Sequence, residues 1–369
     1  EDNMHGKAII FGVTGQDGSH LTDLLLSKGY DVTGVARRCS VDTTQRIKDR
    51  LGCPHFHLVQ GDITDVHSVI SILKDNEDVD EVYNLAAQSH VGVSFKQPGL
   101  TWDITGKGCF NILQSIVDLD MFGCRFYQAS SSEMFGGSYD IDPRDGSKYQ
   151  DEETKFLPQS PYAIAKCAAH YATRLFREAY GLHASTGILF NHEGPRRGEN
   201  FVTRKITKWI GQFISWCEQL DISPEQLAVG DDEVYIPERK SDQVAYSRFP
   251  KLRLGNLEAH RDWGYAEDYV IAMWLMLQQD ESDDYVVCTG ETHTIKDLLN
   301  YAFGCVGIEN WDRFVTIDPE FYRPAEVDYL RGDYSKARTK LGWEPTHGLE
   351  DLIHIMMEHD LDETIQGLS

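Results

Sequence analysis

The chain has 369 residues and a formal net charge of −24. This charge argues against binding to nucleic acid or to an anionic membrane through a broad basic face, and no apolar run approaches the ~20 residues that a membrane span needs. Because a negatively charged surface repels anions, any phosphate-bearing ligand requires a local cluster of Arg, Lys and backbone N–H groups.

The start of the chain and the cysteines bear on location and on metals. Residues 1–6 are polar and show no signal-peptide pattern, which predicts a cytoplasmic protein. The eight cysteines form no CxxC pair and no Cys/His cluster at zinc-ligand spacing. We therefore expect free thiols, buried or half-buried, and no metal site.

Short apolar runs alternate with amphipathic stretches over the first 190 residues. We predict strands at 8–11, 31–36, 55–60, 81–87, 125–130 and 184–190, with helices at 19–28, 66–74, 108–119 and 161–180. This order predicts βαβ units with right-handed crossovers. The expected fold is therefore α/β, with a doubly wound parallel sheet of Rossmann type.

After residue 190 the pattern loosens. We predict helices at 201–219, 266–278, 294–303 and 349–359, and strands at 252–255 and 285–289. Residues 222–250 are polar and acidic, with three prolines. They are interpreted as a surface insertion, either tolerated without a role or acting as a lid or an oligomer contact.

These elements predict two domains. Residues 1–190, with parts of 255–290, are expected to form a dinucleotide-binding domain. Residues 191–254 and 291–369 are expected to form a smaller C-terminal α/β domain that binds the substrate and carries the insertion.

A glycine-rich segment, Gly-Val-Thr-Gly-Gln-Asp-Gly at 12–18, follows the first predicted strand and opens the first helix. Glycines let the backbone turn sharply and approach a pyrophosphate, and the helix N-terminus offers free N–H donors. This context favours a dinucleotide site over a tight turn with no ligand. The predicted contacts are Gly12, Thr14, Gly15, Gln16, Asp17 and Gly18.

The end of the second predicted strand indicates which dinucleotide binds. NAD-binding folds usually place an acidic residue there, to accept from a ribose hydroxyl. This chain has Arg37 and Arg38 instead, followed by Ser40. Guanidinium groups pair well with a phosphate dianion, which predicts NADP rather than NAD. The alternative is an exposed basic loop.

Two further strand ends carry predicted cofactor contacts. Asp62 and Ile63 follow the third strand, where such folds commonly meet the adenine ring. The fourth strand ends beside the crevice, where Leu85, Ala86, Ala87 and Ser89 are the predicted contacts. Ordinary strand-end packing is an equal alternative for Ala86 and Ala87.

Tyr162 and Lys166 lie four residues apart in a predicted helix, so both side chains share one face. A free tyrosine has a pKa near ~10 and is a poor base at neutral pH. An adjacent ammonium and a positively charged nicotinamide are expected to lower that pKa, so that Tyr162 can take a proton from a sugar hydroxyl. With the glycine segment, this pair resembles the short-chain dehydrogenase/reductase superfamily.

Ser131, Ser132 and Glu133 follow the fifth predicted strand. A hydroxyl there can orient the substrate beside Tyr162. A carboxylate at this place is not needed by a 4-epimerase, but a 4,6-dehydratase requires one. It removes the C5 proton once C4 is a ketone, and then helps the C6 hydroxyl leave as water. The alternative for Glu133 is a surface acid at a strand end.

Over nearly its whole length the chain resembles the GDP-mannose 4,6-dehydratase family. The matching motifs are 12–18, 37–38, 86–91, 131–133, 160–166, 190–193, 195–198, 201–206, 254–257, 261–264, 322–324 and 326–328. The resemblance implies catalytic roles for Ser131, Glu133, Tyr162 and Lys166. It implies cofactor contacts at Tyr162, Lys166, Leu189, Asn191, His192 and Arg197. It implies nucleotide-sugar contacts at Ser89, Ser132, Glu133, Asn191, Lys205, Arg261, Arg323 and Glu326.

The resemblance also implies the ligands and the assembly: bound NADP, a nucleotide sugar such as GDP-mannose, and a homodimer or homotetramer that contacts a neighbour near residues 37–40. Three departures stand out. Ser131 replaces the family's threonine, Lys96 and Gly99-Leu100 differ from the usual residues, and 222–250 is longer than the family's connection. Two alternatives therefore stay open: a dehydratase or epimerase acting on another nucleotide sugar such as a GDP-heptose, and a non-catalytic NADP-binding regulator.

Overall fold

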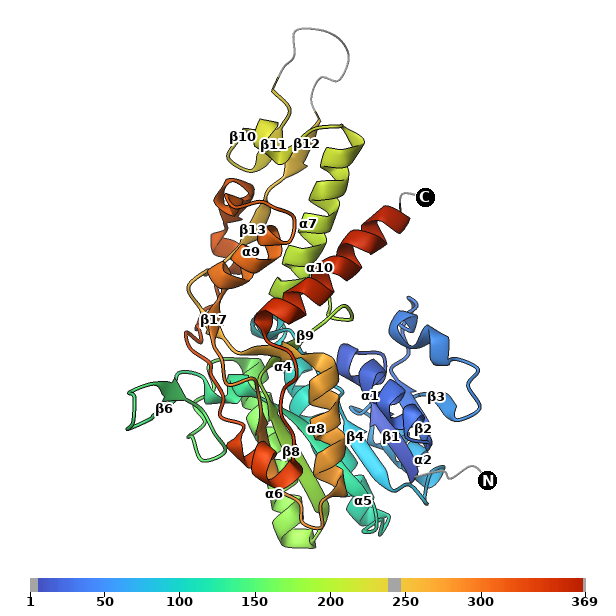
Figure 1. Ribbon diagram of the computed structural model, residues 1–369. Coiled ribbons are helices and arrows are strands. Elements are labelled where there is room, and N and C mark those ends of the chain that lie inside the picture. The colour runs from blue at the N-terminus through green and yellow to red at the C-terminus, as the bar shows by residue number, and fades with distance from the viewer. Residues whose placement is uncertain (1–5, 238–246, 368–369) are drawn as a thin grey trace.

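The computed structural model describes residues 6–237 and 247–367 (Figure 1). Its main sheet has seven parallel strands in the order β16-β8-β5-β4-β1-β2-β3. The strands are β1 (Gly6–Phe11), β2 (Tyr30–Ala36), β3 (Phe56–Gln60), β4 (Glu81–Asn84), β5 (Arg125–Ser131), β8 (His183–Leu189) and β16 (Asp284–Val287). The chain leaves β1 in both directions along the sheet, so a crevice opens at the carboxyl ends of β1 and β4. The predicted doubly wound parallel sheet is confirmed.

Helices cover both faces of this sheet. One face carries α1 (Gln16–Ser27) and α8 (Ala266–Gln278), whose Leu21, Leu25 and Met273 pack on the strands. The other carries α2 (Val66–Lys74), α5 (Gly108–Asp118) and α6 (Pro161–Tyr180). Two short helices, α3 (Val91–Lys96) and α4 (Pro98–Thr101), lead through a wide helical turn (Trp102–Lys107) into α5.

The C-terminal part stands above the carboxyl edge of the sheet (Figure 1). It contains α7 (Val202–Gln219), α9 (Ile295–Gly304) and α10 (Leu349–Gln366), with a parallel pair formed by β13 (Leu252–Leu254) and β18 (Val315–Ile317). The buried Arg204 of α7 holds both carboxylate oxygens of Asp360 in α10 at 2.9 Å. The stretch Ala337–Leu341 returns to the sheet, where Ala337 and Leu341 pack in the core beside α8.

The described part of the predicted surface insertion at 222–250 contains a small antiparallel sheet. It consists of β10 (Ala228–Val229), β11 (Glu233–Tyr235) and β12 (Arg248–Pro250). Phe249 anchors it on α7, with its ring 5.5 Å from those of Trp209 and Phe213. Strands of two or three residues are too short to show alternation in the sequence, which is why they were not predicted. Residues 238–246 of the predicted insertion lie outside the described residues.

Three two-stranded ladders and several single helical turns complete the fold. The ladders join β9 (Asn191–Glu193) to β15 (Trp263–Tyr265), β14 (His260–Arg261) to β17 (His293–Thr294), and β6 (Asp140–Ile141) to β7 (Lys148–Tyr149). The turns are Gln45–Arg50, Ser132–Phe135, Pro224–Gln226, Trp311–Phe314 and Pro319–Phe321. Within the described residues, no helix combines the length and the apolar character needed to cross a membrane.

The side chain of Asp262 links two loops through hydrogen bonds. Its fully buried carboxylate accepts hydrogen bonds from Thr289 (N at 2.8 Å, Oγ1 at 2.7 Å), Gly290 N (2.9 Å) and Gly332 N (3.1 Å). In Asp262→Asn an amide N–H₂ must face some of these donors, so we expect the free energy of unfolding to fall by about 2–3 kcal/mol. Urea unfolding measures this. The exposed Asp280→Asn is the control, and an unchanged midpoint for Asp262→Asn would contradict the argument.

Candidate active site

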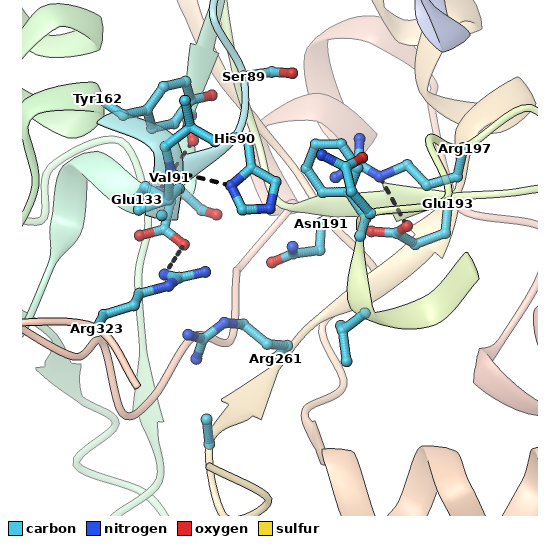
Figure 2. Close-up of a pocket in the computed structure, with 18 of the residues that line it drawn as sticks. Ser89, His90, Val91, Glu133, Tyr162, Asn191, Glu193, Arg197, Arg261 and Arg323 are labelled. Atoms are coloured by element: carbon cyan, nitrogen blue, oxygen red, sulfur yellow. Dashed lines mark hydrogen bonds and ion pairs between the residues drawn. The ribbon is translucent and has the colours of Figure 1, made fainter. Parts of the chain in front are cut away.

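A cavity of about 980 Å³ lies between the carboxyl edge of the sheet and the C-terminal part. Figure 2 shows side chains from both parts converging on it. All four predicted catalytic residues line it, namely Ser131, Glu133, Tyr162 and Lys166. All predicted substrate contacts line it too, namely Ser89, Ser132, Glu133, Asn191, Lys205, Arg261, Arg323 and Glu326. The structure thus brings together residues from Ser89 to Glu326, which are 237 positions apart in the sequence.

A single turn after β5 places Glu133 at the cavity. The Ser131 hydroxyl accepts a hydrogen bond from the Glu133 N–H at 3.2 Å and so caps the turn. Gly136 ends the turn with φ +57°, and a Cβ there would lie 1.7 Å from the Leu157 carbonyl oxygen. Only glycine fits, so this turn directs the Glu133 side chain inward, where the residue is 8% exposed. The predicted surface alternative for Glu133 is therefore wrong.

Helix α6 presents Tyr162 and Lys166 one turn apart. The helix begins cleanly because Ser160 accepts from Ala163 N at 3.0 Å and Pro161 occupies the first turn. Both side chains are buried against the end of β5, where Lys166 Nζ donates to the Ala129 carbonyl at 2.7 Å. The ammonium lies 5.7 Å from the centre of the Tyr162 ring.

The two groups titrate far from their ordinary ranges. Burial raises the pKa of Tyr162 to about 12, although a hydrogen bond from Ser131 opposes this. Burial lowers the pKa of Lys166 to about 8. In the protein alone, burial thus outweighs any lowering of the Tyr162 pKa by the neighbouring ammonium. The lowering by that ammonium together with a positively charged nicotinamide stays a prediction. A further positive charge near the phenol is needed to make it a base.

The turn between β1 and α1 fits a dinucleotide pyrophosphate. Gly12 has φ +85°, and a Cβ there would lie 2.8 Å from Ala86 N. A Cβ on Gly18 would lie 2.3 Å from the Gly12 carbonyl oxygen. Gly15 starts the helix without a side-chain cap, so the first N–H groups of α1 are left for an anion.

The predicted cofactor residues fall into two groups. Asp17, Leu85, Ala87, Ser89, Leu189, Asn191, His192 and Arg197 line the cavity together with Tyr162 and Lys166. Gly12, Thr14, Gly15, Gln16, Gly18, Arg37, Arg38, Ser40, Asp62, Ile63 and Ala86 lie outside its wall. The side chains of Arg37, Arg38 and Ser40 are exposed just beyond β2. Their contact with a cofactor stays a prediction.

Asp17 and His192 link the first helix to β9. The Asp17 carboxylate lies 2.6 Å from His192 Nε2. Burial tends to raise the pKa of Asp17, but the charge and hydrogen bond of His192 outweigh burial and lower this pKa to about 2. The Asp17 carboxylate is therefore ionised across the neutral range, and its contact with His192 fixes one wall of the cavity.

Cations gather at the opposite wall, as a phosphate ligand of so acidic a protein requires. Arg261 is buried, and its Nη1 donates to the carbonyls of His260 (2.9 Å) and Val327 (2.6 Å). Lys205 Nζ donates to the Arg253 carbonyl at 2.6 Å and lies 3.7 Å from the centre of the Phe321 ring. Arg323 Nη1 lies 3.3 Å from the Glu133 carboxylate (Figure 2).

Some lining residues were not predicted. His90 caps α3, its Nδ1 accepting from Val93 N at 3.2 Å, and its ring faces the middle of the cavity (Figure 2). Phe201 and Tyr322 also line it. All three lie in motifs that the sequence singled out, but no charge or spacing marked them as contacts. In the segment beyond the fourth strand that departs from the family, Lys96 lines the cavity, whereas Gly99 and Leu100 are exposed and do not line it.

The fold and the site, together with a matching family model and curated relatives, define a nucleotide-sugar enzyme of the short-chain dehydrogenase/reductase class. A family model described as GDP-mannose 4,6 dehydratase matches residues 9–220 and 238–356. The chain belongs to the GDP-mannose 4,6-dehydratase family. The match omits 221–237, which includes β10 and β11. The extra length of the connection at 222–250 stays a prediction.

Relatives and solved structures agree with this assignment. "GDP-mannose 4,6 dehydratase 1" of Arabidopsis thaliana is 46% identical over 367 residues, covering 96% of this chain and 90% of the relative. "GDP-mannose 4,6 dehydratase" of Homo sapiens is 39% identical over 378 residues, covering 96% and 91%. The structure of dTDP-glucose 4,6-dehydratase from Bacillus anthracis in complex with NAD aligns with a TM-score of 0.75 at 16% identity, covering 99% of this chain and 100% of that one. It supports the fold alone.

Proposed function

We propose that this protein converts GDP-mannose to GDP-4-keto-6-deoxymannose with bound NADP. The observation that carries the proposal is the inward carboxylate of Glu133, which shares one cavity with Ser131, Tyr162 and the cations Arg261 and Arg323. An epimerase needs no acid there, and a regulator would not need this constellation.

The chain's own residues divide the work of the reaction. Ser131 and Tyr162 hold the C4 hydroxyl, and the Tyr162 phenolate takes its proton. When bound, NADP would supply the acceptor for the hydride from C4 and, once reduced, the donor of the hydride to C6. Glu133 removes the C5 proton and passes it to the C6 hydroxyl, which leaves as water. The proton that Tyr162 took from the C4 hydroxyl then goes to C5 when hydride is added at C6, so that Tyr162 is a base again. Lys205, Arg261 and Arg323 neutralise the diphosphate, and Glu326 accepts from the ribose hydroxyls.

Product analysis tests this function. Enzyme with bound NADP is incubated separately with GDP-, UDP-, CDP- and dTDP-linked sugars, and products are identified by mass. Loss of one water from GDP-mannose, with a 4-keto-6-deoxy sugar as product, supports the proposal. Turnover of another nucleotide sugar in preference to GDP-mannose would replace the substrate, and turnover of none would exclude the enzyme class.

The preference for NADP rests on Arg37 and Arg38. Arg37→Asp combined with Arg38→Ala removes two guanidinium groups that match a 2′-phosphate, so we expect NADP affinity to fall by at least about tenfold while NAD affinity changes little. Titration of each cofactor by calorimetry measures both. Lys48→Ala, an exposed residue of the following turn, is the control. Equal losses for NADP and NAD would refute the assignment.

We also propose a homo-oligomer in the cytoplasm. The outer face of α6 exposes Ile164, Tyr171 and Leu175, each more than half exposed (52%, 51% and 53%), and Trp102 and Phe110 expose apolar surface nearby. Such a face is typical of an oligomer contact. All eight cysteines are free thiols; six are buried or half-buried as expected, whereas the expectation is wrong for Cys39 and Cys305, which are exposed. Free thiols are typical of proteins in a reducing compartment. Light scattering on Ile164→Asp and on the intact protein tests the assembly.

A further inference from the structure

One ion pair joins two residues that have different proposed roles. Glu133 is the proposed acid–base residue, and Arg323 is a proposed ligand of the diphosphate. Their side chains lie 3.3 Å apart. In the described part of the chain, 6–237 and 247–367, this is the one hydrogen-bonding contact of the Glu133 carboxylate. The catalytic carboxylate is thus engaged by a group that the substrate also requires.

The two arginines of this wall differ in how they are held. Arg261 is buried and tied to two backbone carbonyls, so its charge is fixed. The backbone N–H of Arg323 is held by Glu326 Oε1 at 2.9 Å, but its guanidinium is partly exposed and bonds only Glu133 among the described residues. Arg323 can therefore turn at the cost of that one ion pair.

We propose that the substrate's diphosphate takes Arg323 away from Glu133, so that the catalytic carboxylate is released only when a nucleotide sugar is in place. This inference rests on the proposed function. A diphosphate carries more negative charge and more acceptor oxygens than one carboxylate, so it competes well for a guanidinium. Arg323 is in this respect a positioning residue, acting on C5 through Glu133. The charge of Glu133 also acts on Arg261 and Tyr162.

A double-mutant cycle on nucleotide binding tests the release. GDP, which carries the diphosphate but no sugar, is titrated by calorimetry into NADP-saturated wild type, Glu133→Gln, Arg323→Met and the double variant. Glu133→Gln leaves Arg323 without its partner, so GDP should bind about threefold to tenfold more tightly. In the Arg323→Met background the same change should leave GDP affinity unaltered. Arg323→Lys, which keeps the charge, should restore part of the coupling.

Controls separate the ion pair from a general charge effect. Glu320→Gln removes one negative charge from an exposed position on the wall of the same cavity and should change GDP affinity little. Guanosine lacks the diphosphate and should bind wild type and Glu133→Gln alike. An equal gain in both Arg323 backgrounds, or no gain in either, would overturn the proposal. Dehydration of GDP-mannose by the wild type tests the proposed function separately, because the binding cycle involves no turnover.

Discussion

Glu133→Gln should lower the rate of water loss from GDP-mannose by about a thousandfold or more. The amide has nearly the size of the carboxylate, but it can neither take the C5 proton nor return a proton to the departing C6 hydroxyl. Removing one positioned acid–base group typically costs 10²–10⁴-fold, and here one group serves two consecutive steps. Mass spectrometry of the sugar product measures water loss directly. Turnover in deuterated water adds a second measurement, because deuterium can enter C5 only after Glu133 or a substitute has removed the C5 proton.

The matched control is Glu153→Gln, which makes the same chemical change at an exposed residue and should leave turnover unaltered. Glu133→Gln should also still bind GDP, about threefold to tenfold more tightly than the wild type, since Lys205, Arg261 and Arg323 remain and Arg323 has lost its partner. A variant with wild-type activity, or one that exchanges C5 deuterium at the wild-type rate, would show that another group is the base.

The sequence predicted the regular parts of the fold because long periodic segments carry their own signal. Helix α6 was predicted with the bounds that the structure has, since Ser160, Pro161 and Gly181 mark its ends. The fourth strand was predicted too long, to residue 87. In the structure β4 ends at Asn84, because its neighbour β1 ends at Phe11 before the chain turns at Gly12. A single strand's composition cannot report where its partner stops.

The sequence allowed separate sets of site residues to be predicted, but not how these sets lie relative to one another. The spacing of Tyr162 and Lys166, and the acid after the fifth strand, follow from chemistry. The remaining contacts came from resemblance. That Arg323 lies against Glu133 depends on a contact across 190 residues, which no local pattern encodes. His90 was missed for a related reason, because its place in the cavity depends on the cap of a six-residue helix that shows no periodicity.

Lys166→Met should make the protein more stable and nearly inactive. Near pH 7 the buried ammonium is kept charged against the cost of desolvation, which lowers the pKa of Lys166 to about 8. Methionine fills much of the same space without a charge. The Ala129 carbonyl keeps a donor, because Gln128 Nε2 also bonds it at 3.0 Å. We expect the free energy of unfolding to rise by about 1–3 kcal/mol, after subtracting the lost hydrogen bond, and turnover to fall by at least about a hundredfold.

The stability difference between Lys166→Met and the wild type should depend on pH. A lysine whose pKa is lower in the folded state destabilises the fold while both states are protonated, and this cost disappears as pH rises from about 8 to the unfolded value near ~10.4. The stability advantage of Lys166→Met should therefore be largest near ~pH 7 and vanish near ~pH 10. Urea unfolding at both pH values, without added cofactor, measures it. Lys107→Met, at an exposed lysine, should show no such pH-dependent gain. A Lys166→Met variant less stable than wild type near neutral pH would contradict the prediction. It would mean that the surrounding residues stabilise the Lys166 ammonium, so that its buried charge does not lower the free energy of unfolding.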